Sequence, residues 1–344
     1  MAPDDIAAHG LRWSSDAEPG LTRRGRGKGF SFHHPDGTLV KDPETLDRAR
    51  RLAVPPAYKD VWICADPNGH LQATGIDARG RKQYRYHPRW QAVQDEAKFH
   101  RLRRFGEVLP SLRRRVAHDL GLPGLPPEKV TAAVVRLLEQ TLIRVGNLEY
   151  ARDNDSYGLT TLREDHVDVN GPDIHFSFRG KSGKEWEVDV RDPRAAEVVA
   201  QCQDLPGQEL FQWMDEDGTP HAVGSSDVNA YLRAHGDEDF TAKDFRTWAG
   251  TALAFRHLQG LEPPATKRET KARLKEALQA VAAELGNTIA VCRRSYVHPS
   301  IIDCFETGRM KRALAEAQER LDDAPRGLRS EERLLWAFLA AVEA

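Results

Sequence analysis

Four separated segments of the chain carry polar side chains that together could act on a phosphodiester. They contribute Arg144, Lys181, Arg246 and the pair Asn287 and Tyr296, which lie nine residues apart. A tyrosine hydroxyl has a pKa of ~10 and is a weak nucleophile at neutral pH unless cations stabilise the developing charge. Guanidinium groups suit the non-bridging oxygens of a phosphate, because they stay charged and bind in a bidentate way. The set is therefore suited to phosphoryl transfer onto tyrosine.

The remaining groups of the set suit the other steps of such a reaction. A lysine on a loop tip can deliver the proton that a leaving 5′-oxygen needs, which makes Lys181 the candidate general acid. Asn287 can donate a neutral hydrogen bond to a non-bridging oxygen, but it cannot carry a proton through the physiological pH range. Three cations make a metal ion unnecessary, and the exchange of one phosphodiester for another needs no ATP. The sequence also lacks the pattern GxxxxGK[ST], so we expect neither a metal nor a cofactor.

Each of these residues also has an ordinary interpretation when taken alone. Arg144 at the end of a helix would simply favour the helix dipole, and Lys181 near two glycines would be a solvated turn residue. Tyr296 is one of seven tyrosines and would more often be a packing residue. Lys243 and Arg246 are less ordinary, because cations are disfavoured at a helix N-terminus and an anion is their natural partner.

Local sequence rules place the first two segments on definite elements. An apolar face over residues 126–146 predicts a helix that begins at a pair of prolines and carries Arg144 at its end. Alternating residues on both sides of a glycine-rich turn predict a β-hairpin over residues 174–190, with Lys181 in its loop.

The other two segments follow predicted helix signals. Thr241 and Asp244 resemble a capping box, which would start a helix that carries Arg246. An apolar face over residues 274–285 predicts the next helix, which Gly286 would stop shortly before Tyr296. The larger part of the chain, residues 91–344, is therefore expected to be a mainly helical domain with a small three-stranded sheet.

Residues 1–90 are expected to form a separate small domain of α+β type. Turn signals and alternating apolar residues predict antiparallel strands around residues 30–32, 61–64 and 70–74, and a short helix over residues 43–52. The fold class is thus multidomain α+β.

Composition is typical of a globular protein without membrane segments. The 344 residues are 40% hydrophobic and 30% charged, which fits two domains, and no apolar run approaches the ~20 residues that span a bilayer. The N-terminus lacks the basic and apolar regions of a signal peptide, so we expect a cytoplasmic, nucleoid-associated protein. The four cysteines are far apart in sequence and predict neither a zinc site nor disulfides.

The distribution of charge, rather than its sum, points to an anionic partner. Net charge is only −2, but residues 79–115 hold twelve basic residues against three acidic ones. Such a stretch suits a surface that faces phosphate, although residues 101–115 could equally be a solvated helix face.

The order and spacing of these segments resemble the catalytic domain of type IB DNA topoisomerases, in their poxvirus and bacterial branch. The matching segments, in chain order, are Arg144, residues 158–162, Gly180 with Lys181, Lys243 to Arg246, Gly286 to Thr288, and Tyr296. Residues 158–162 match a strand of that family. Asn287 replaces the usual histidine of the family, although bacterial members can carry asparagine there.

The N-terminal region adds a further match. Residues 75–86 are similar to the segment GxDxxGRxQYxY, which contacts duplex DNA in that family. The resemblance covers about residues 25–300 and implies the DNA-contacting residues Arg79, Arg81, Lys82, Gln83, Tyr84, Tyr86, Tyr150 and Lys243. Tyr84 and Tyr86 would share one face of a strand, where packing within the sheet is the alternative.

The resemblance implies a monomer that clamps duplex DNA, nicks one strand through a 3′-phosphotyrosine at Tyr296, lets the strand swivel and reseals it. A tyrosine site-specific recombinase is the alternative among enzymes. Those enzymes usually place histidine three residues before the second arginine, where this chain has Lys243, and they lack this N-terminal domain. A non-catalytic DNA-binding protein that retains the fold is the third possibility.

Overall fold

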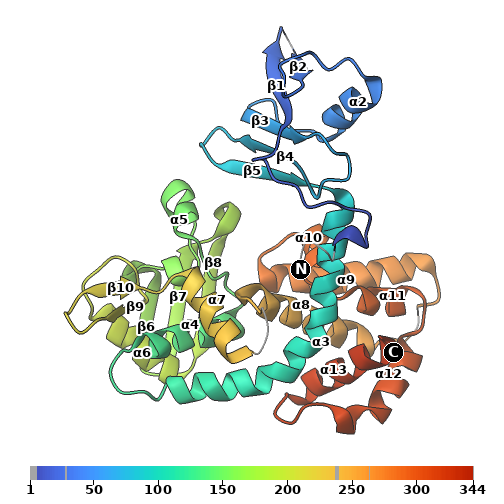
Figure 1. Ribbon diagram of the computed structural model, residues 1–344. Helices are drawn as coiled ribbons and strands as arrows, with labels where there is room; N and C mark the ends of the chain where they lie inside the picture. The colour runs from blue at the N-terminus through green and yellow to red at the C-terminus, as the bar shows by residue number, and fades with distance from the viewer. Residues whose placement is uncertain (1–5, 28, 237–239, 263, 344) are drawn as a thin grey trace. The chain divides into compact units, whose positions relative to one another are not determined.

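The computed structural model describes residues 6–27, 29–236, 240–262 and 264–343, with the side chains of all of these except residues 91, 92, 94–97, 149, 150 and 182. The side chain of Tyr150, an expected DNA contact, therefore lies outside the described residues. The chain divides into two compact units, Met1–Lys98 and Phe99–Ala344, whose elements are labelled in Figure 1.

The first unit is a five-stranded antiparallel sheet with the strand order β2-β1-β3-β4-β5. Its elements are β1 (Gly20–Arg26), β2 (Gly29–His33), α2 (Pro43–Arg51), β3 (Lys59–Cys64), β4 (Leu71–Ile76) and β5 (Lys82–Tyr86). Leu21, Phe32 and Ile63 are among the buried residues of its core. Helix α2 begins where Asp42 accepts a hydrogen bond from the backbone N–H of Thr45 at 2.8 Å. The expected small α+β domain is confirmed.

The second unit is mainly helical and surrounds one three-stranded antiparallel sheet, β6-β7-β8. The sheet consists of β6 (Val167–Asn170), β7 (Asp173–Arg179) and β8 (Glu185–Arg191), and a separate pair consists of β9 (Gln212–Met214) and β10 (Pro220–Ala222). The helices are α3 (Pro88–Asp119), which begins in the first unit, α4 (Pro127–Thr141), α5 (Leu148–Asn154), α6 (Pro193–Gln203), α7 (Ser225–Gly236), α8 (Ala242–Gln259), α9 (Lys267–Leu285), α10 (Ile289–Ser295), α11 (Pro299–Glu306), α12 (Met310–Glu319) and α13 (Ser330–Val342). This is the expected architecture. Among the helices that the structure describes, none is long and apolar enough to cross a bilayer.

Helix α4 ends earlier than the sequence predicts. It stops at Thr141 rather than near residue 146, because Leu142 adopts a left-handed conformation with φ of 56°. The Thr141 hydroxyl donates to Leu137 O at 2.7 Å and accepts the N–H of Ile143 at 3.2 Å, so that N–H no longer continues the helix. Arg144 consequently lies on an irregular segment and not on a helix end.

Residues 158–162 also differ from the expected strand. They contain a 3₁₀ turn, Leu159–Thr161, in which the Thr161 hydroxyl accepts the Gly158 N–H at 3.0 Å. The backbone N–H of Leu159 donates to Arg144 O at 2.9 Å, and that of Thr160 donates to Val145 O at 2.7 Å. The turn thereby fixes the irregular segment that carries Arg144.

The hairpin and the two helix signals are confirmed. The β7–β8 hairpin closes through a 3₁₀ turn, Lys181–Gly183, and Asp244 accepts the Thr241 N–H at 2.8 Å at the start of α8. Gly286 ends α9 with φ of 59°, and a Cβ there would lie 2.4 Å from the Trp186 ring. Both the conformation and the close approach require glycine at this position.

The basic stretch on α3 is largely balanced by acids of the same unit. Arg113 pairs with Glu139 and Glu332, each at 2.7 Å. Arg115 pairs with Asp119 at 2.7 Å. Further pairs link Arg103 to Glu107 and Glu343, and Arg104 to Glu107. These contacts give the cations a structural role, so their number alone does not mark a DNA-facing surface.

Candidate active site

One pocket of the second unit brings most of the proposed catalytic side chains together. Its volume is about 270 Å³, and its lining includes Arg144, Lys181, Lys243, Arg246 and Tyr296. These residues come from the segment after α4, the tip of the β7–β8 hairpin, the first turns of α8 and the end of α10. Asn287 joins the group through a hydrogen bond from Arg144.

Arg246 is held by the ends of two helices. Its side chain is buried, and Nη2 donates to Leu285 O at 2.6 Å while Nη1 donates to Leu142 O. Both carbonyls lie at helix C-termini, where the helix dipole favours a cation. Burial lowers the pKa of Arg246, and the neighbouring Arg144 acts in the same direction. The guanidinium still stays protonated, because arginine loses its proton only at extreme pH.

Arg144 and Asn287 orient one another. Arg144 Nη2 donates to Gly286 O at 3.3 Å and to Oδ1 of Asn287. An arginine can only donate, so the Asn287 oxygen must face it and the amide Nδ2 must point elsewhere. Burial lowers the pKa of Arg144 as well.

Two buried donors of this group find no hydrogen-bond partner among the residues that the structure describes. They are Nε of Arg246 and Nδ2 of Asn287. A buried donor without an acceptor costs ~1–3 kcal/mol, so an anion that accepts from either donor would lower that cost. A phosphate has the charge and the acceptor oxygens for this.

Tyr296 lies beside this donor set at the end of α10. Its ring centroid is 5.3 Å from Cζ of Arg246, and its backbone N–H donates to Cys292 O at 3.0 Å. The side chain is half-buried and lines the pocket. The arrangement places a phenol next to two arginines, as attack on a phosphodiester requires.

The two lysines of the pocket are exposed. Lys181 lies at the hairpin tip, and Lys243 lies in the first turn of α8. An exposed lysine at a pocket rim can reach a substrate held by the arginines and is suited to donate a proton to it.

Two residues that the sequence reasoning missed hold Tyr296 in place. Thr251 is fully buried on α8, and its hydroxyl donates to Tyr296 O at 3.2 Å. Gly250 lies so close that a Cβ there would be 2.7 Å from the same carbonyl oxygen. Their position one turn after Arg246 was the available signal, but the contact partner lies 45 residues away in sequence.

Three of the expected DNA-contacting residues of the first unit are arranged around Asp77. Arg81 forms an ion pair with Asp77 at 2.9 Å, Gln83 Nε2 donates to it at 3.0 Å, and Arg79 N donates at 2.9 Å. Lys82 Nζ pairs with Asp16 at 2.5 Å.

Tyr84 and Tyr86 share one face of β5, the edge strand of the sheet. Their rings are stacked with centroids 6.2 Å apart and are 49% and 40% exposed, so neither is buried within the sheet.

Two protein-family models match most of the chain. The model of the family described as eukaryotic DNA topoisomerase I, catalytic core, matches residues 87–321, and that of the bacterial DNA topoisomerase IB N-terminal domain matches residues 29–77. The chain belongs to the type IB DNA topoisomerases. As a member of that family it is a type I DNA topoisomerase, and duplex DNA is its substrate.

Two viral relatives support the assignment to the type IB DNA topoisomerases. The chain is 31% identical to DNA topoisomerase 1B of Acanthamoeba polyphaga mimivirus over 297 residues, which cover 83% of this chain and 88% of that protein. It is 21% identical to DNA topoisomerase 1B of Vaccinia virus (strain Copenhagen) over 254 residues, 72% of this chain and 75% of the relative. A solved structure of XerH site-specific recombinase bound to palindromic difH substrate is 12% identical, covers 60% of this chain and 52% of that one, and gives a TM-score of 0.35.

Proposed function

We propose that Tyr296 of this topoisomerase attacks a DNA phosphate and relaxes supercoils through a transient single-strand break. The Tyr296 oxygen forms a bond to phosphorus and releases its proton to solvent. The bond from phosphorus to the 5′-oxygen breaks, and Lys181 gives the leaving oxygen its proton. The products are a 3′-phosphotyrosine and a free 5′-hydroxyl. Attack of that hydroxyl on the phosphotyrosine reverses each step and reseals the strand.

The observation that carries this proposal is the buried donor Nε of Arg246 beside the Tyr296 ring, together with a second buried donor, Nδ2 of Asn287, which is linked to the pocket through Arg144. Arg246 Nε and Asn287 Nδ2 lack partners among the described residues, and they belong to the group that surrounds Tyr296. Donors fixed before the substrate arrives stabilise the charge that develops on the non-bridging oxygens without reorganisation. Arg144 adds a second guanidinium and, because it binds Oδ1 of Asn287, leaves the amide Nδ2 as the donor for a phosphate oxygen.

The reaction needs neither ATP nor a metal ion in this proposal. One phosphodiester is exchanged for another, so the bond energy is retained in the phosphotyrosine. The charge that a metal would neutralise is met by Arg144, Arg246 and Lys181. We further propose that the protein acts as a monomer of 38.6 kDa in the cytoplasm, at the nucleoid. Sedimentation in the presence and absence of a short duplex tests the monomer directly.

Relaxation of supercoiled plasmid in EDTA without ATP tests the mechanism. The wild type should relax the plasmid in steps, and denaturation during the reaction should trap protein on the 3′ end of a nick. Tyr296→Phe should do neither. Tyr231→Phe is the matched control, because this buried tyrosine donates to Asp119 at 2.7 Å and takes no part in the pocket; it should keep both activities.

The outcomes separate the alternatives. Relaxation by Tyr296→Phe would show that another residue is the nucleophile. Recombination between two specific sites, without relaxation of ordinary plasmid, would favour a recombinase. Binding of DNA with neither reaction would indicate a non-catalytic member of the fold.

A further inference from the structure

The indole of Trp186 lies between two glycines that each precede a residue of the proposed site. Trp186 is on β8 and is buried. A Cβ at Gly180, the residue before Lys181, would lie 2.7 Å from both Cδ1 and Nε1 in the five-membered ring. A Cβ at Gly286, the residue before Asn287, would overlap Cζ2 in the six-membered ring. One rigid side chain therefore packs against the backbone of both segments.

The indole is also fixed within its own hairpin. It stacks on Phe178, its partner on β7, with ring centroids 6.2 Å apart and an interplanar angle of 5°. The turn next to it is closed by the Gly180 N–H, which donates to Lys184 O at 2.7 Å. A ring packed closely in this way transmits a displacement from one neighbour to the other.

Lys184 makes a second link from the hairpin to the end of α9. Its Nζ lies 5.2 Å from the centroid of the Trp186 ring and donates to Ala283 O at 3.4 Å. That carbonyl belongs to the last turn of α9, where the helix dipole favours a cation. The hairpin is thus attached to the helix whose end leads directly to Gly286.

The backbone on the other side of Trp186 belongs to the donor set of the pocket. Gly286 O accepts a hydrogen bond from Nη2 of Arg144 at 3.3 Å, and Oδ1 of Asn287 accepts from the same guanidinium. This side is held by α9 itself, because the Gly286 N–H donates to Ala283 O at 3.3 Å and the Asn287 N–H donates to Ala282 O at 3.0 Å. Loss of the indole would therefore release the hairpin tip rather than the end of α9.

We propose that Trp186 is a positioning residue for the general acid and sets the place of Lys181 relative to Arg144 and Asn287. The inference rests on the proposed function, because it takes Lys181 to be the proton donor of the 5′-oxygen. A proton donor must come within ~2.6–3.2 Å of its acceptor, and a small displacement has a large effect on rate. Loss of Trp186 should therefore slow the step that needs the proton of Lys181.

Cleavage of two matched duplexes tests this role. One carries the ordinary 5′-oxygen at the bond to be cleaved, and the other carries sulfur in its place. A thiol has a pKa of ~8.5 and leaves as a thiolate, so the sulfur duplex needs no proton from the enzyme. The measured quantity is the ratio of the sulfur rate to the oxygen rate in single-turnover cleavage. This ratio does not depend on the fraction of the enzyme that is folded.

The variants should raise this ratio above that of the wild type. Lys181→Ala is the reference, and we expect a rise of roughly 10²- to 10⁴-fold, the usual contribution of general acid catalysis. Trp186→Ala should raise the ratio roughly tenfold or more, because the lysine is retained but displaced. Gly180→Ala should act in the same direction, since alanine adopts its φ of −96° readily and the indole is the obstacle to the methyl group.

The effects of the two positioning variants should not add. When Gly180→Ala is combined with Trp186→Ala, the methyl group no longer meets an indole and should raise the ratio no further. Additive effects would show that the two residues act independently, which contradicts the packing argument.

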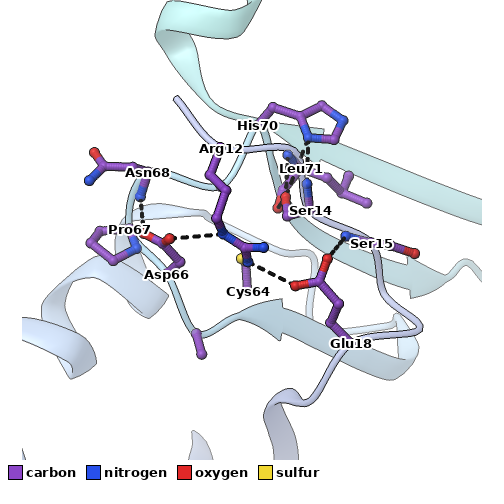
Figure 2. A network of polar contacts seen from close by, with 12 residues as sticks. Arg12, Ser14, Ser15, Glu18, Cys64, Asp66, Pro67, Asn68, His70 and Leu71 are labelled. Atoms are coloured by element: carbon purple, nitrogen blue, oxygen red, sulfur yellow. Dashed lines mark hydrogen bonds and ion pairs between the residues drawn. The ribbon is translucent and has the colours of Figure 1, made fainter. Parts of the chain in front are cut away.

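Two control variants remove interactions elsewhere in the molecule. Trp213→Ala removes an indole on β9 that stacks on His221 with centroids 4.6 Å apart. Ser14→Ala removes a buried hydroxyl of the first unit, which donates to Leu71 O at 3.0 Å and accepts the Leu71 N–H at 3.1 Å (Figure 2). Both should lower the temperature of unfolding and keep the wild-type ratio.

The results separate this inference from the proposed function. If Lys181→Ala raises the ratio but Trp186→Ala and Gly180→Ala do not, Trp186 has no positioning role. A similar rise in Trp213→Ala or Ser14→Ala would also overturn the inference, since loss of stability alone would then produce the effect. If Lys181→Ala leaves the ratio unchanged, Lys181 is not the general acid, so the proposed function fails at that step and the inference fails with it.

Discussion

The hydroxyl of Thr251 donates to the backbone carbonyl of Tyr296 at 3.2 Å. It also accepts the backbone N–H of His298 at 3.1 Å, so one buried side chain bridges both sides of the turn that follows the tyrosine. Thr251 lies on α8 just over one turn after Arg246. A single helix therefore carries the arginine that we propose binds phosphate, and fixes the backbone of the proposed nucleophile relative to it.

Removal of that hydroxyl should slow cleavage without loss of DNA binding. We expect Thr251→Val to lower the single-turnover cleavage rate roughly 10- to 100-fold, because a small displacement of a nucleophile has a large effect on rate. Thr251→Ser keeps the hydroxyl and should restore the rate. Thr247→Val is the control, because Thr247 is equally buried on α8 but donates to Lys243 O within its own helix. If the valine variants at the two positions cleave at the same rate, Thr251 has no positioning role.

A methyl group at residue 250 should displace the tyrosine directly. In Gly250→Ala the new Cβ would lie 2.7 Å from Tyr296 O and 3.1 Å from Cδ1 of Leu285. We expect a free energy of unfolding lower by ~1–3 kcal/mol, the usual cost of overpacking, together with slower cleavage. Gly260→Ala, at the end of the same helix, meets no atom within 4 Å and has φ of −89°. Chemical denaturation should show it unchanged or slightly more stable, and a similar loss in both variants would refute the steric argument.

The amide of Asn287 should contribute to the rate as a hydrogen-bond donor. We expect Asn287→Ala to lower the cleavage rate by roughly 10²-fold, the scale of a lost oxyanion donor. Asn287→Asp has the same shape but would bring a negative charge toward the phosphate, so it should be slower still. Single-turnover cleavage of a labelled duplex measures both, and an unchanged rate in the alanine variant would remove Asn287 from the site.

The ion pairs of Glu332 should make the second unit sensitive to acid. Burial alone would raise the pKa of Glu332, but hydrogen bonds from Arg113 and from the backbone of Arg329 outweigh it and hold that pKa below its usual value. Because the folded pKa is the lower one, this carboxylate stabilises the fold above its unfolded pKa, ~4.3, and the stabilisation is lost as pH falls through the folded pKa. Glu332→Gln should therefore lower stability at pH 7 and reduce its decline in acid, as measured by denaturation across pH.

The partner of this carboxylate offers a second measurement. Arg113→Met leaves the buried Glu332 and the half-buried Glu139 with Arg329 as their remaining cationic partner and should cost up to ~3–5 kcal/mol of unfolding free energy. Lys311→Met is the control, because its pair with Glu262 is exposed and such pairs contribute ~0–1 kcal/mol. Equal losses in the two variants would contradict the importance of the buried network.

Local signals in the sequence were sufficient to place much of the site. The hairpin that carries Lys181, the start of α8 and the glycine that ends α9 all follow from the conformational preferences of a few adjacent residues. The end of α4 did not follow from them, because a threonine hydroxyl and a left-handed leucine stop that helix inside its apolar face.

Contacts between distant segments could not be derived in this way. Arg246 contacts Leu142 across 104 residues, and Arg113 contacts Glu332 across 219. Contacts between residues so far apart in the sequence leave no pattern in it. For this reason the basic stretch on α3 suggested a phosphate-binding surface, although several of its arginines form ion pairs within the unit.

The two carbonyls that hold Arg246 also bear on when the proposed site is able to cleave DNA. Leu142 O and Leu285 O lie together beside Arg246 only when α4 and α9 have formed and packed against α8. In the proposed mechanism, a chain that is still being synthesised, or that has partly unfolded, would have Tyr296 without the assembled arginines and could not cleave a DNA strand. Cleavage would then be confined to folded molecules, which can also reseal the strand.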